Sequence, residues 1–251
     1  MTERLSFDRV ATVYDETRSL RPRALARVLA VLVDELAGKR ILEVGVGTGR
    51  YAVPLQKSGI HVVGVDISRP MVAFGLAKGL RDVVFADGSR LPFVAKSFDA
   101  ATTNHVLHLI DNWREVLQEI RRVTQELYFT VIERSDRPTL NFEYDRLVRE
   151  GGFEWRHPGV HERDLPNLLK PDLIIPAGPF HETVPADLMI QDLKMRAFSN
   201  QWAVPEAIHE AAIARLRERW AGKDLRRTTT LEVAFWNVDR LAELGEVSQR
   251  S

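Results

Sequence analysis

Short runs of apolar residues recur along residues 40–132 and alternate with segments whose apolar positions follow a helical spacing. The runs are ILEVGV (41–46), HVVGVD (61–66), DVVFAD (82–87), FDAATTN (98–104) and ELYFTVIE (126–133). Each run predicts a strand, and the segments between several of them predict helices over 50–58, 69–78 and 112–123. Strands that alternate with helices predict an α/β fold, in which a parallel sheet is covered by helices on both faces.

The two flanks of this region have different patterns. Apolar residues within 7–14 form a helical stripe, and a second helix is predicted over 22–37. After residue 133, seven prolines between 138 and 185 and the pair Gly151-Gly152 indicate irregular structure, with one helix over 140–150. A further helix is predicted over 205–220. We expect the segments FHETVPADLMI and TTTLEVAFWNV to form a strand-rich end of the chain.

Composition excludes several kinds of protein. The 251 residues are 45% hydrophobic and 28% charged, which is ordinary for a globular protein with a real core. Lys+Arg and Asp+Glu both number 35, so a net charge of zero gives no support for a polyanionic partner such as nucleic acid. The sequence has no cysteine, which excludes disulfides, thiolate catalysis and cysteine-bound metals.

Charge and apolar length also bear on location. Arg18, Arg21, Arg23 and Arg27 form a local cluster, which favours a solvated helix face over a site for an acidic ligand. The amino terminus, MTERLSFDRV, is charged and carries no apolar signal region. The longest apolar segment, 25–33, is interrupted by Arg27 and is too short to span a bilayer. We therefore expect a cytoplasmic, soluble protein without a membrane span.

A glycine turn follows the first predicted strand directly. Gly45, Gly47 and Gly49 alternate with other residues, and Arg50 stands where the third glycine of a dinucleotide-binding turn would be. The phosphate-gripping pattern G-x-x-x-x-G-K-[ST] is absent. Asp66 ends the second strand, 21 positions after Gly45, where a carboxylate can accept hydrogen bonds from ribose hydroxyls. The alternative is an aspartate that caps the helix after it.

The ordered motifs ILEVGVGTGR, VVGVDIS and FADGSRLPFVAKSFDAATTNHVLHLI resemble those of class I S-adenosylmethionine-dependent methyltransferases. The similarity is greatest to the small-molecule branch that includes the ubiquinone-biosynthesis type, and it covers roughly residues 5–133. It implies a Rossmann-like, doubly wound, mostly parallel seven-stranded sheet with a final antiparallel hairpin. It also implies an amino-terminal helical lid over 1–38 and a methyltransferase core over 39–251, with a substrate-facing insertion over 134–180 after the fifth strand.

The same resemblance assigns residues to the cofactor S-adenosyl-L-methionine. Glu43, Gly45, Val46 and Gly47 would border its methionine part, and Asp66 would hold the ribose hydroxyls. The other residues that the resemblance places at the cofactor are Ile67 and Met71 beside the adenine or ribose, Asp87 and Gly88 at the adenine, Asn104 near the sulfonium, and Tyr14 as an aromatic lid. This assignment fits the chemistry, because the cofactor carries a sulfonium, a zwitterionic amino acid, a ribose and an adenine but no phosphate.

Methyl transfer is an in-line displacement, so the protein must mainly align the acceptor, exclude water and remove a proton where one is lost. His105 follows the fourth strand near the expected sulfonium and is the candidate catalytic base, although a histidine that only holds the loop is the alternative. His157 and His161 are four residues apart, but Pro158 and Gly159 argue against a helical metal site, and no metal is expected.

The resemblance implies a small-molecule methyl acceptor, methylated at oxygen, nitrogen or carbon. Phe142, Tyr144, Phe153, Trp155 and Arg156 lie where the family has variable substrate elements, and burial against the sheet is the equal alternative. The sequence TTNHV after the fourth strand lacks the pattern N-P-P-[YF], which disfavours DNA adenine methylation. The sequence leaves open whether the protein is a monomer or a homodimer.

Three other functions remain as alternatives. A non-catalytic S-adenosylmethionine-binding protein would share the same motifs. An NAD-dependent oxidoreductase would share the fold but would need the glycine that Arg50 replaces. An RNA or protein methyltransferase gains no support from the neutral charge.

Overall fold

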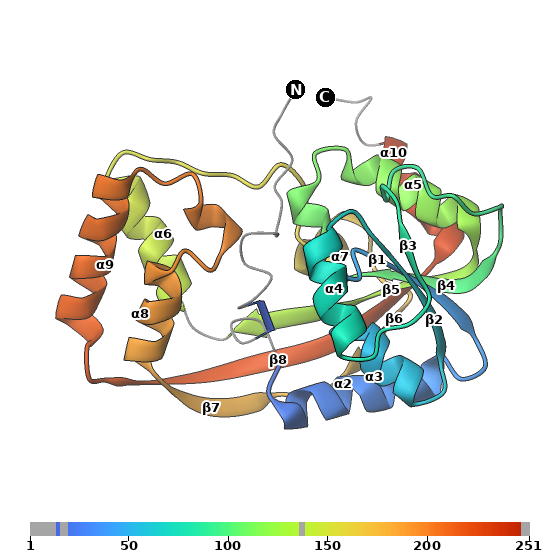
Figure 1. Cartoon of the computed structure of the whole chain (residues 1–251), viewed down its shortest axis with the longest axis horizontal. Helices are drawn as coiled ribbons and strands as arrows, with labels where there is room; N and C mark the ends of the chain where they lie inside the picture. Colours follow the sequence, from blue (N-terminus) through green and yellow to red (C-terminus); the bar gives the residue numbers. More distant parts are fainter. Residues whose placement is uncertain (1–13, 16–19, 136–138, 247–251) are drawn as a thin grey trace.

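The computed structural model describes residues 14–15, 20–135 and 139–246. A single mixed sheet runs through the molecule (Figure 1). Its strands are β1 (Arg40–Val44), β2 (His61–Asp66), β3 (Val83–Phe85), β4 (Phe98–Thr103), β5 (Thr124–Ser135), β6 (Leu173–Pro176), β7 (Phe180–Pro185) and β8 (Asp224–Asn237). The strand order is β3-β2-β1-β4-β5-β8-β6. The remaining strand, β7, also pairs with β8 but is not part of this linear order.

Strands β1 to β5 pair in parallel, whereas β8 lies antiparallel to β5, β6 and β7. The predicted fold class is therefore confirmed, including the antiparallel end of the sheet. One difference is the extra strand β7, which pairs with residues 224–229 of β8. This pairing is available because β8 has 14 residues and extends beyond β6, whose partners are residues 232–235 of the same strand.

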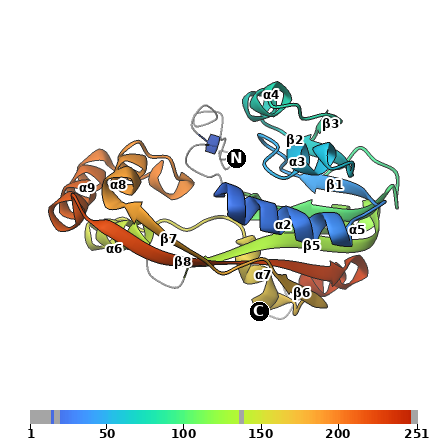
Figure 2. The same ribbon diagram turned by 90° about the horizontal axis from the view of Figure 1, so that it is seen from below.

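Both faces of the parallel part are buried, as alternation along the strands requires. In β1, Leu42 and Val44 pack into one core cluster with α5 (Trp113–Val123) and α7 (Leu165–Leu168). Ile41 packs into the opposite cluster with α2 (Pro22–Glu35) and α3 (Ala52–Lys57). Figure 2 shows α2 lying along the sheet. The helix α4 (Arg69–Ala77) follows β2, so the helices predicted between the strands are confirmed within a few residues.

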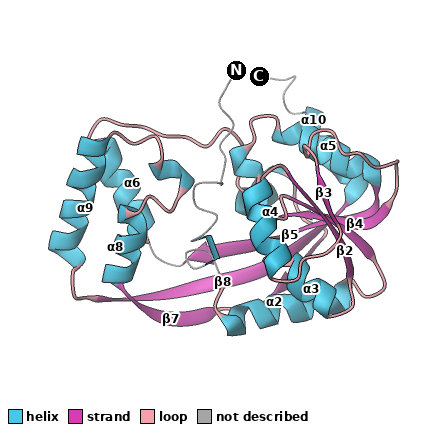
Figure 3. Cartoon of the chain, viewed as in Figure 1, coloured by secondary structure: helices cyan, strands magenta, loops and turns pink. Residues whose placement is uncertain are grey.

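Three helices form a second unit at one end of the molecule (Figure 3). They are α6 (Leu140–Glu150), α8 (Ala186–Lys194) and α9 (Glu206–Trp220), and their buried apolar side chains make a separate cluster. Inside this three-helix unit, the Tyr144 hydroxyl and His209 Nδ1 are 2.7 Å apart in a hydrogen bond. The strands β7 and β8 run from the sheet to these helices.

The prediction for FHETVPADLMI is half wrong. Its first part forms β7, but the strand ends at Pro185 and Ala186 begins α8. The reason is tertiary: Ala186, Ile190 and Leu193 recur at helical spacing and are buried in the three-helix unit. The short elements are the 3-10 helices η2 (Leu107–Leu109), η3 (Glu162–Asp164), η4 (Ser199–Gln201) and η5 (Val238–Ala242), and α10 (Glu243–Glu246).

The division into a lid, a core and an insertion stays a prediction. Residues 1–13 and 16–19 of the expected lid lie outside the described residues, and α2 packs against β8 and α3. The helix α6 falls inside the predicted insertion, whereas α8 and α9, which pack with it, follow that insertion in sequence. Within the described residues, no helix is both long and apolar enough to cross a membrane.

Candidate active site

The carboxyl ends of four parallel strands bring the predicted cofactor residues to one edge of the sheet. Glu43 and Val44 near the end of β1 lie opposite Gly64 and Val65 of β2 on one side. On the other side they lie opposite Thr102 and Thr103 of β4. The chain turns outward in opposite directions from β1 and β4, and ligands of open α/β sheets bind at such a switch point.

The glycine turn after β1 adopts a backbone that only glycine tolerates well. Gly45, Gly47 and Gly49 have φ angles of 78°, 51° and 73°. A Cβ on Gly45 would lie 2.6 Å from Cγ2 of Val106, so this turn is in direct contact with the loop after β4. The turn is tied to the neighbouring strand, because the Val65 carbonyl accepts hydrogen bonds from the amides of Gly45 and Val46.

The Asp66 carboxylate connects the glycine turn to the helix after β2. Its Oδ2 accepts a hydrogen bond of 2.7 Å from the Gly47 amide, and its Oδ1 accepts one of 2.8 Å from the Ser68 amide. The N-cap of α4 is Ser68, whose hydroxyl oxygen accepts from the Met71 amide. Asp66 is therefore not the capping residue of α4, and its contacts fix the glycine turn relative to β2.

Glu43 places a buried carboxyl beside the same turn. Its side chain is only 3% exposed. Burial raises the pKa of Glu43 to about 8, against the lowering effects of hydrogen bonds from the Asn104 side chain and the Ala52 backbone. Glu43 Oε2 and Nε of the nearby Arg50 are both buried and have no hydrogen-bond partner among the described residues. The turn is thus bordered by one unpaired acceptor and one unpaired donor.

The adenine-side residues contribute packing and a polar turn. Met71 is buried, and its Cε lies 3.2 Å from the position that a Gly47 Cβ would take, whereas Ile67 is 55% exposed. Asp87 Oδ1 accepts hydrogen bonds from the amide and the hydroxyl of Ser89, which shapes the turn after β3. A Cβ on the next residue, Gly88, would meet Val44 Cγ1 at 2.8 Å.

Asn104 and His105 lie in the loop after β4. Asn104 Oδ1 accepts a 3.0 Å hydrogen bond from the Val131 amide of β5, and its Nδ2 donates to Thr102 Oγ1. His105 is half-buried and has a φ of 59°, the left-handed region that a residue with a side chain rarely adopts. The loop therefore carries two predicted site residues, and one of them has a strained backbone.

A short piece of the amino-terminal segment lies against the glycine turn. The Thr48 hydroxyl donates a 2.6 Å hydrogen bond to Asp15 Oδ1, and Lys78 pairs with the same carboxylate. Tyr14, the predicted lid residue, is half-buried beside it. The sequence pattern did not single out Asp15, because its contact with Thr48 depends on the folded chain, and it noted Arg50 only as the residue that replaces a glycine.

The five residues considered for an acceptor pocket have different environments. Tyr144 is fully buried, and Phe153 packs against the same three-helix cluster. The Trp155 ring lies 6.3 Å from the His157 ring, and the exposed Arg156 pairs with Glu154. Phe142 is 54% exposed. For Tyr144, the interpretation as a core residue is the one that fits.

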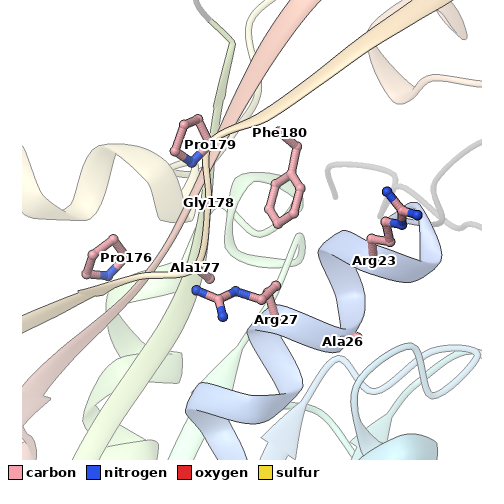
Figure 4. Close-up of a pocket in the computed structure, with 8 residues that line it drawn as sticks. All are labelled: Arg23, Ala26, Arg27, Pro176, Ala177, Gly178, Pro179 and Phe180. Carbon is pink, nitrogen blue, oxygen red and sulfur yellow. The ribbon is translucent and has the colours of Figure 1, made fainter.

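A surface depression of about 670 Å³ lies away from these residues (Figure 4). It is lined by Arg23, Ala26 and Arg27 of α2 and by the segment 176–180, and no predicted cofactor residue lines it. Arg23 and Arg27 are exposed, and the neighbouring Arg21 pairs with Glu182. These positions agree with a solvated helix face for that part of the arginine cluster.

Comparison with known proteins gives a family match for the part of the chain that contains most of these strand ends. Residues 42–127 match the family model described as "Methyltransferase domain". A demethylmenaquinone methyltransferase of Renibacterium salmoninarum is 32% identical over 138 residues, which cover 53% of this chain and 58% of that protein. The chain thus aligns with little more than half the length of this curated relative.

Solved structures extend the likeness over the fold. An S-adenosylmethionine-dependent methyltransferase of Thermotoga maritima gives a TM-score of 0.51 at 17% identity and covers 91% of this chain and 96% of its own. The [4+2]-cyclase SpnF gives a TM-score of 0.53 at 20% identity, with coverage of 91% and 93%. At these identities the likeness concerns the fold alone. Residues 42–127 match a methyltransferase domain, and for that part the resemblance to class I S-adenosylmethionine-dependent methyltransferases is confirmed.

Proposed function

We propose that the protein binds S-adenosyl-L-methionine at this strand edge and transfers its methyl group to a small-molecule acceptor. The observation that carries the proposal is the joining of the glycine turn to the acidic end of β2, through the 2.7 Å hydrogen bond from the Gly47 amide to Asp66 Oδ2. The methyltransferase-domain match over 42–127 contains both residues.

The residues present fit the amino-acid end of this cofactor. Glu43 Oε2 and Arg50 Nε are buried and unpartnered among the described residues, and a zwitterion offers an ammonium to the first and a carboxylate to the second. An ammonium beside Glu43 favours the ionised carboxylate, which burial alone disfavours. The Val46 amide, next to Gly45 in the turn, donates a hydrogen bond to the Val65 carbonyl of β2, which holds the turn at the proposed site.

The other assignments follow the order of the strand ends. Asp66 accepts hydrogen bonds from the ribose hydroxyls, and Ile67 and Met71 give an apolar side to the adenine or ribose. Asp87 and Gly88 border the adenine, Asn104 borders the sulfonium, and Tyr14 covers the site. The exposed Ile67 supports this assignment, because an apolar side chain that is 55% exposed at a strand edge gains from being covered by a ligand.

Bound S-adenosylmethionine supplies an electrophilic methyl group, so the chain needs no acid to activate the leaving group. The protein holds the acceptor in line and keeps water out. His105 accepts a proton from the acceptor nucleophile when one is released, since a neutral imidazole has a ring nitrogen that can take it up. A cytoplasmic location and a monomeric or homodimeric state stay predictions.

The runner-up is a non-catalytic S-adenosylmethionine-binding protein or a different reaction on the same fold. The fold likeness to the [4+2]-cyclase SpnF supports this alternative, because proteins of one fold can catalyse different reactions. An NAD-dependent oxidoreductase is less favoured, since Arg50 replaces the glycine that the dinucleotide turn requires.

The test is transfer of a labelled methyl group. The full chain is incubated with methyl-labelled S-adenosylmethionine and a bacterial metabolite extract, with demethylmenaquinol as one defined acceptor in parallel. We expect a labelled small-molecule product that is lost with Asp66→Ala. Binding of the cofactor without transfer to any compound would favour the non-catalytic alternative.

A further inference from the structure

A buried carboxylate from a distant segment supports the loop after β4. Glu162 is 5% exposed and lies 56 residues beyond Val106 in sequence. Its Oε1 accepts hydrogen bonds of 2.7 Å from the Val106 amide and 2.9 Å from the Leu107 amide. A carboxylate that accepts two backbone hydrogen bonds in a buried place fixes the backbone that donates them.

The two amides come directly after the strained residue of the candidate site. His105 has a φ of 59°, a strained conformation that a residue with a side chain keeps only where the surrounding structure holds it. On the other side, Asn104 is held by the Val131 amide. Glu162 thus supplies the fixed point on the carboxyl side of His105.

The segment before Glu162 lies directly on the same loop. The Gly159 amide donates a 3.1 Å hydrogen bond to the His108 carbonyl. A Cβ on Gly159 would lie 2.0 Å from the Leu107 carbonyl oxygen, so only glycine permits this approach. The chain around 159–162 therefore acts as a strap across residues 106–108.

A cluster of three histidine rings includes His108, the ring nearest to the second oxygen of Glu162. His108 Nδ1 lies 3.8 Å from Glu162 Oε2, and the His108 ring stacks on His161 at 4.6 Å between centroids. The His157 ring lies 4.7 Å from both. In the described parts of the chain, no three histidine, aspartate or glutamate side chains are placed to hold a metal ion. The three rings pack on one another, and one of them lies beside the carboxylate.

The charge state of Glu162 agrees with this role. Burial by itself raises the pKa of Glu162, but the nearby His108 ring and the backbone hydrogen bond from Leu107 outweigh it and hold the pKa below its usual range. The carboxylate is ionised at neutral pH. The carboxamide oxygen of a glutamine could accept the same two backbone hydrogen bonds without the charge.

We propose that Glu162 is a positioning residue for methyl transfer: it holds Val106 and Leu107 so that His105 keeps its left-handed backbone beside the cofactor edge. The inference rests on the proposed function, because positioning His105 matters to a reaction only if that edge is the reaction site. Glu162 acts through the loop and has no assigned contact with cofactor or acceptor.

The test compares Glu162→Ala, Glu162→Gln and the matched control Glu154→Ala in the full chain. Glu154 lies in the same segment, is exposed and pairs only with the exposed Arg156 among the described residues. Three quantities are measured: the hydrogen exchange of the Val106 and Leu107 amides by NMR, the affinity for S-adenosylhomocysteine by calorimetry, and the labelled methyl transfer at saturating S-adenosylmethionine in the extract assay.

We expect Glu162→Ala to speed exchange at the two amides at least about tenfold and to lower the transfer rate about tenfold or more. The KM for S-adenosylmethionine and the affinity for S-adenosylhomocysteine should stay within about twofold, because Asp66 and the glycine turn keep their own hydrogen bonds to each other and to β2. Glu162→Gln should recover most of the rate, and Glu154→Ala should match the wild type. A lower transfer rate at unchanged cofactor affinity distinguishes a positioning role from a general loss of structure.

Unchanged transfer by Glu162→Ala, despite faster exchange at Val106 and Leu107, would overturn the proposal. Parallel loss of S-adenosylhomocysteine affinity and rate in Glu162→Ala, without rescue by glutamine, would also overturn it. If the wild-type protein binds no S-adenosylhomocysteine, the proposed function fails instead, and the exchange measurement still reports whether Glu162 holds the loop.

Discussion

The Glu43 carboxyl is buried near the end of a parallel strand with one oxygen unpartnered among the described residues, an unfavourable place for a negative charge. Burial raises its pKa to about 8, so the free protein holds a proton there at neutral pH. Asp66, in the next strand, has both oxygens engaged by backbone amides. The two acidic residues of the candidate site therefore differ: Glu43 is protonated in the free protein, whereas Asp66 is fixed by two backbone hydrogen bonds.

The first prediction concerns pH. Between the ordinary pKa of 4.5 and about 8, folded Glu43 keeps a proton that the unfolded chain releases. The contribution of Glu43 to the free energy of unfolding therefore falls as pH rises through this window, by at most about 1.4 kcal/mol per pH unit. Urea unfolding at a series of pH values should show that the wild type loses stability relative to Glu43→Gln as the pH rises from 4.5 to about 8. A difference independent of pH would contradict the assigned pKa.

At the scale of elements, the site depends on close contacts between a strand and the loops beside it. Gly88, after β3, lies where a Cβ would meet Val44 Cγ1 of β1 at 2.8 Å and Val116 Cγ1 of α5 at 3.4 Å. Both valines are fully or almost fully buried. Gly88 thus sets how closely the turn after β3 approaches β1 and α5.

The second prediction is a coupling between these residues. Gly88→Ala should destabilise the protein by about 1–3 kcal/mol, because the added methyl group overpacks the contact. Val44→Ala removes Cγ1 and leaves a cavity, but it also makes room for the new methyl group. In denaturant unfolding, the double variant should lose less free energy than the sum of the single variants. If the two losses of free energy simply add, the turn after β3 moves away from Val44 to accommodate the new methyl group.

Local pattern predicted the strands, most helices and the strand-end residues, because hydrophobic periodicity and glycine turns act over a few residues. It did not predict Asp15 or Glu162, whose partners lie far along the chain and leave no spacing signal. It also gave a strand at 186–190, where the fold makes a helix because Ile190 and Leu193 bury against α6 and α9. Tertiary burial overrode the local preference there.

At the scale of the whole molecule, a sheet with its ligand edge is joined to a three-helix unit with a separate core. The unit contains its own buried polar pair, Tyr144 and His209, and His209 is 1% exposed. Burial lowers the pKa of His209, which keeps the ring neutral and able to pair with the tyrosine hydroxyl. A substitution at this pair should therefore lower the stability of the three-helix unit without changing the proposed cofactor site.

The third prediction follows from this separation. Tyr144→Phe leaves His209 Nδ1 without its tyrosine hydroxyl partner, at a cost of about 1–3 kcal/mol. Native-state hydrogen exchange should become faster in α6, α8 and α9 while β1, β2 and β4 keep their protection. The affinity for S-adenosylhomocysteine should stay within about twofold. Equal loss of protection in both parts would show that they unfold as one cooperative unit.

Calorimetric titration of the full chain with S-adenosylhomocysteine measures binding at the proposed cofactor site directly. We expect one binding site that weakens about tenfold or more with Asp66→Asn, because the ribose loses a charged acceptor and the glycine turn loses its anchor. The control Asp224→Asn, at an exposed position at the start of β8, should bind like the wild type. Absence of binding at millimolar ligand, or binding that is indifferent to Asp66→Asn, would show that these strand ends do not form an S-adenosylmethionine site.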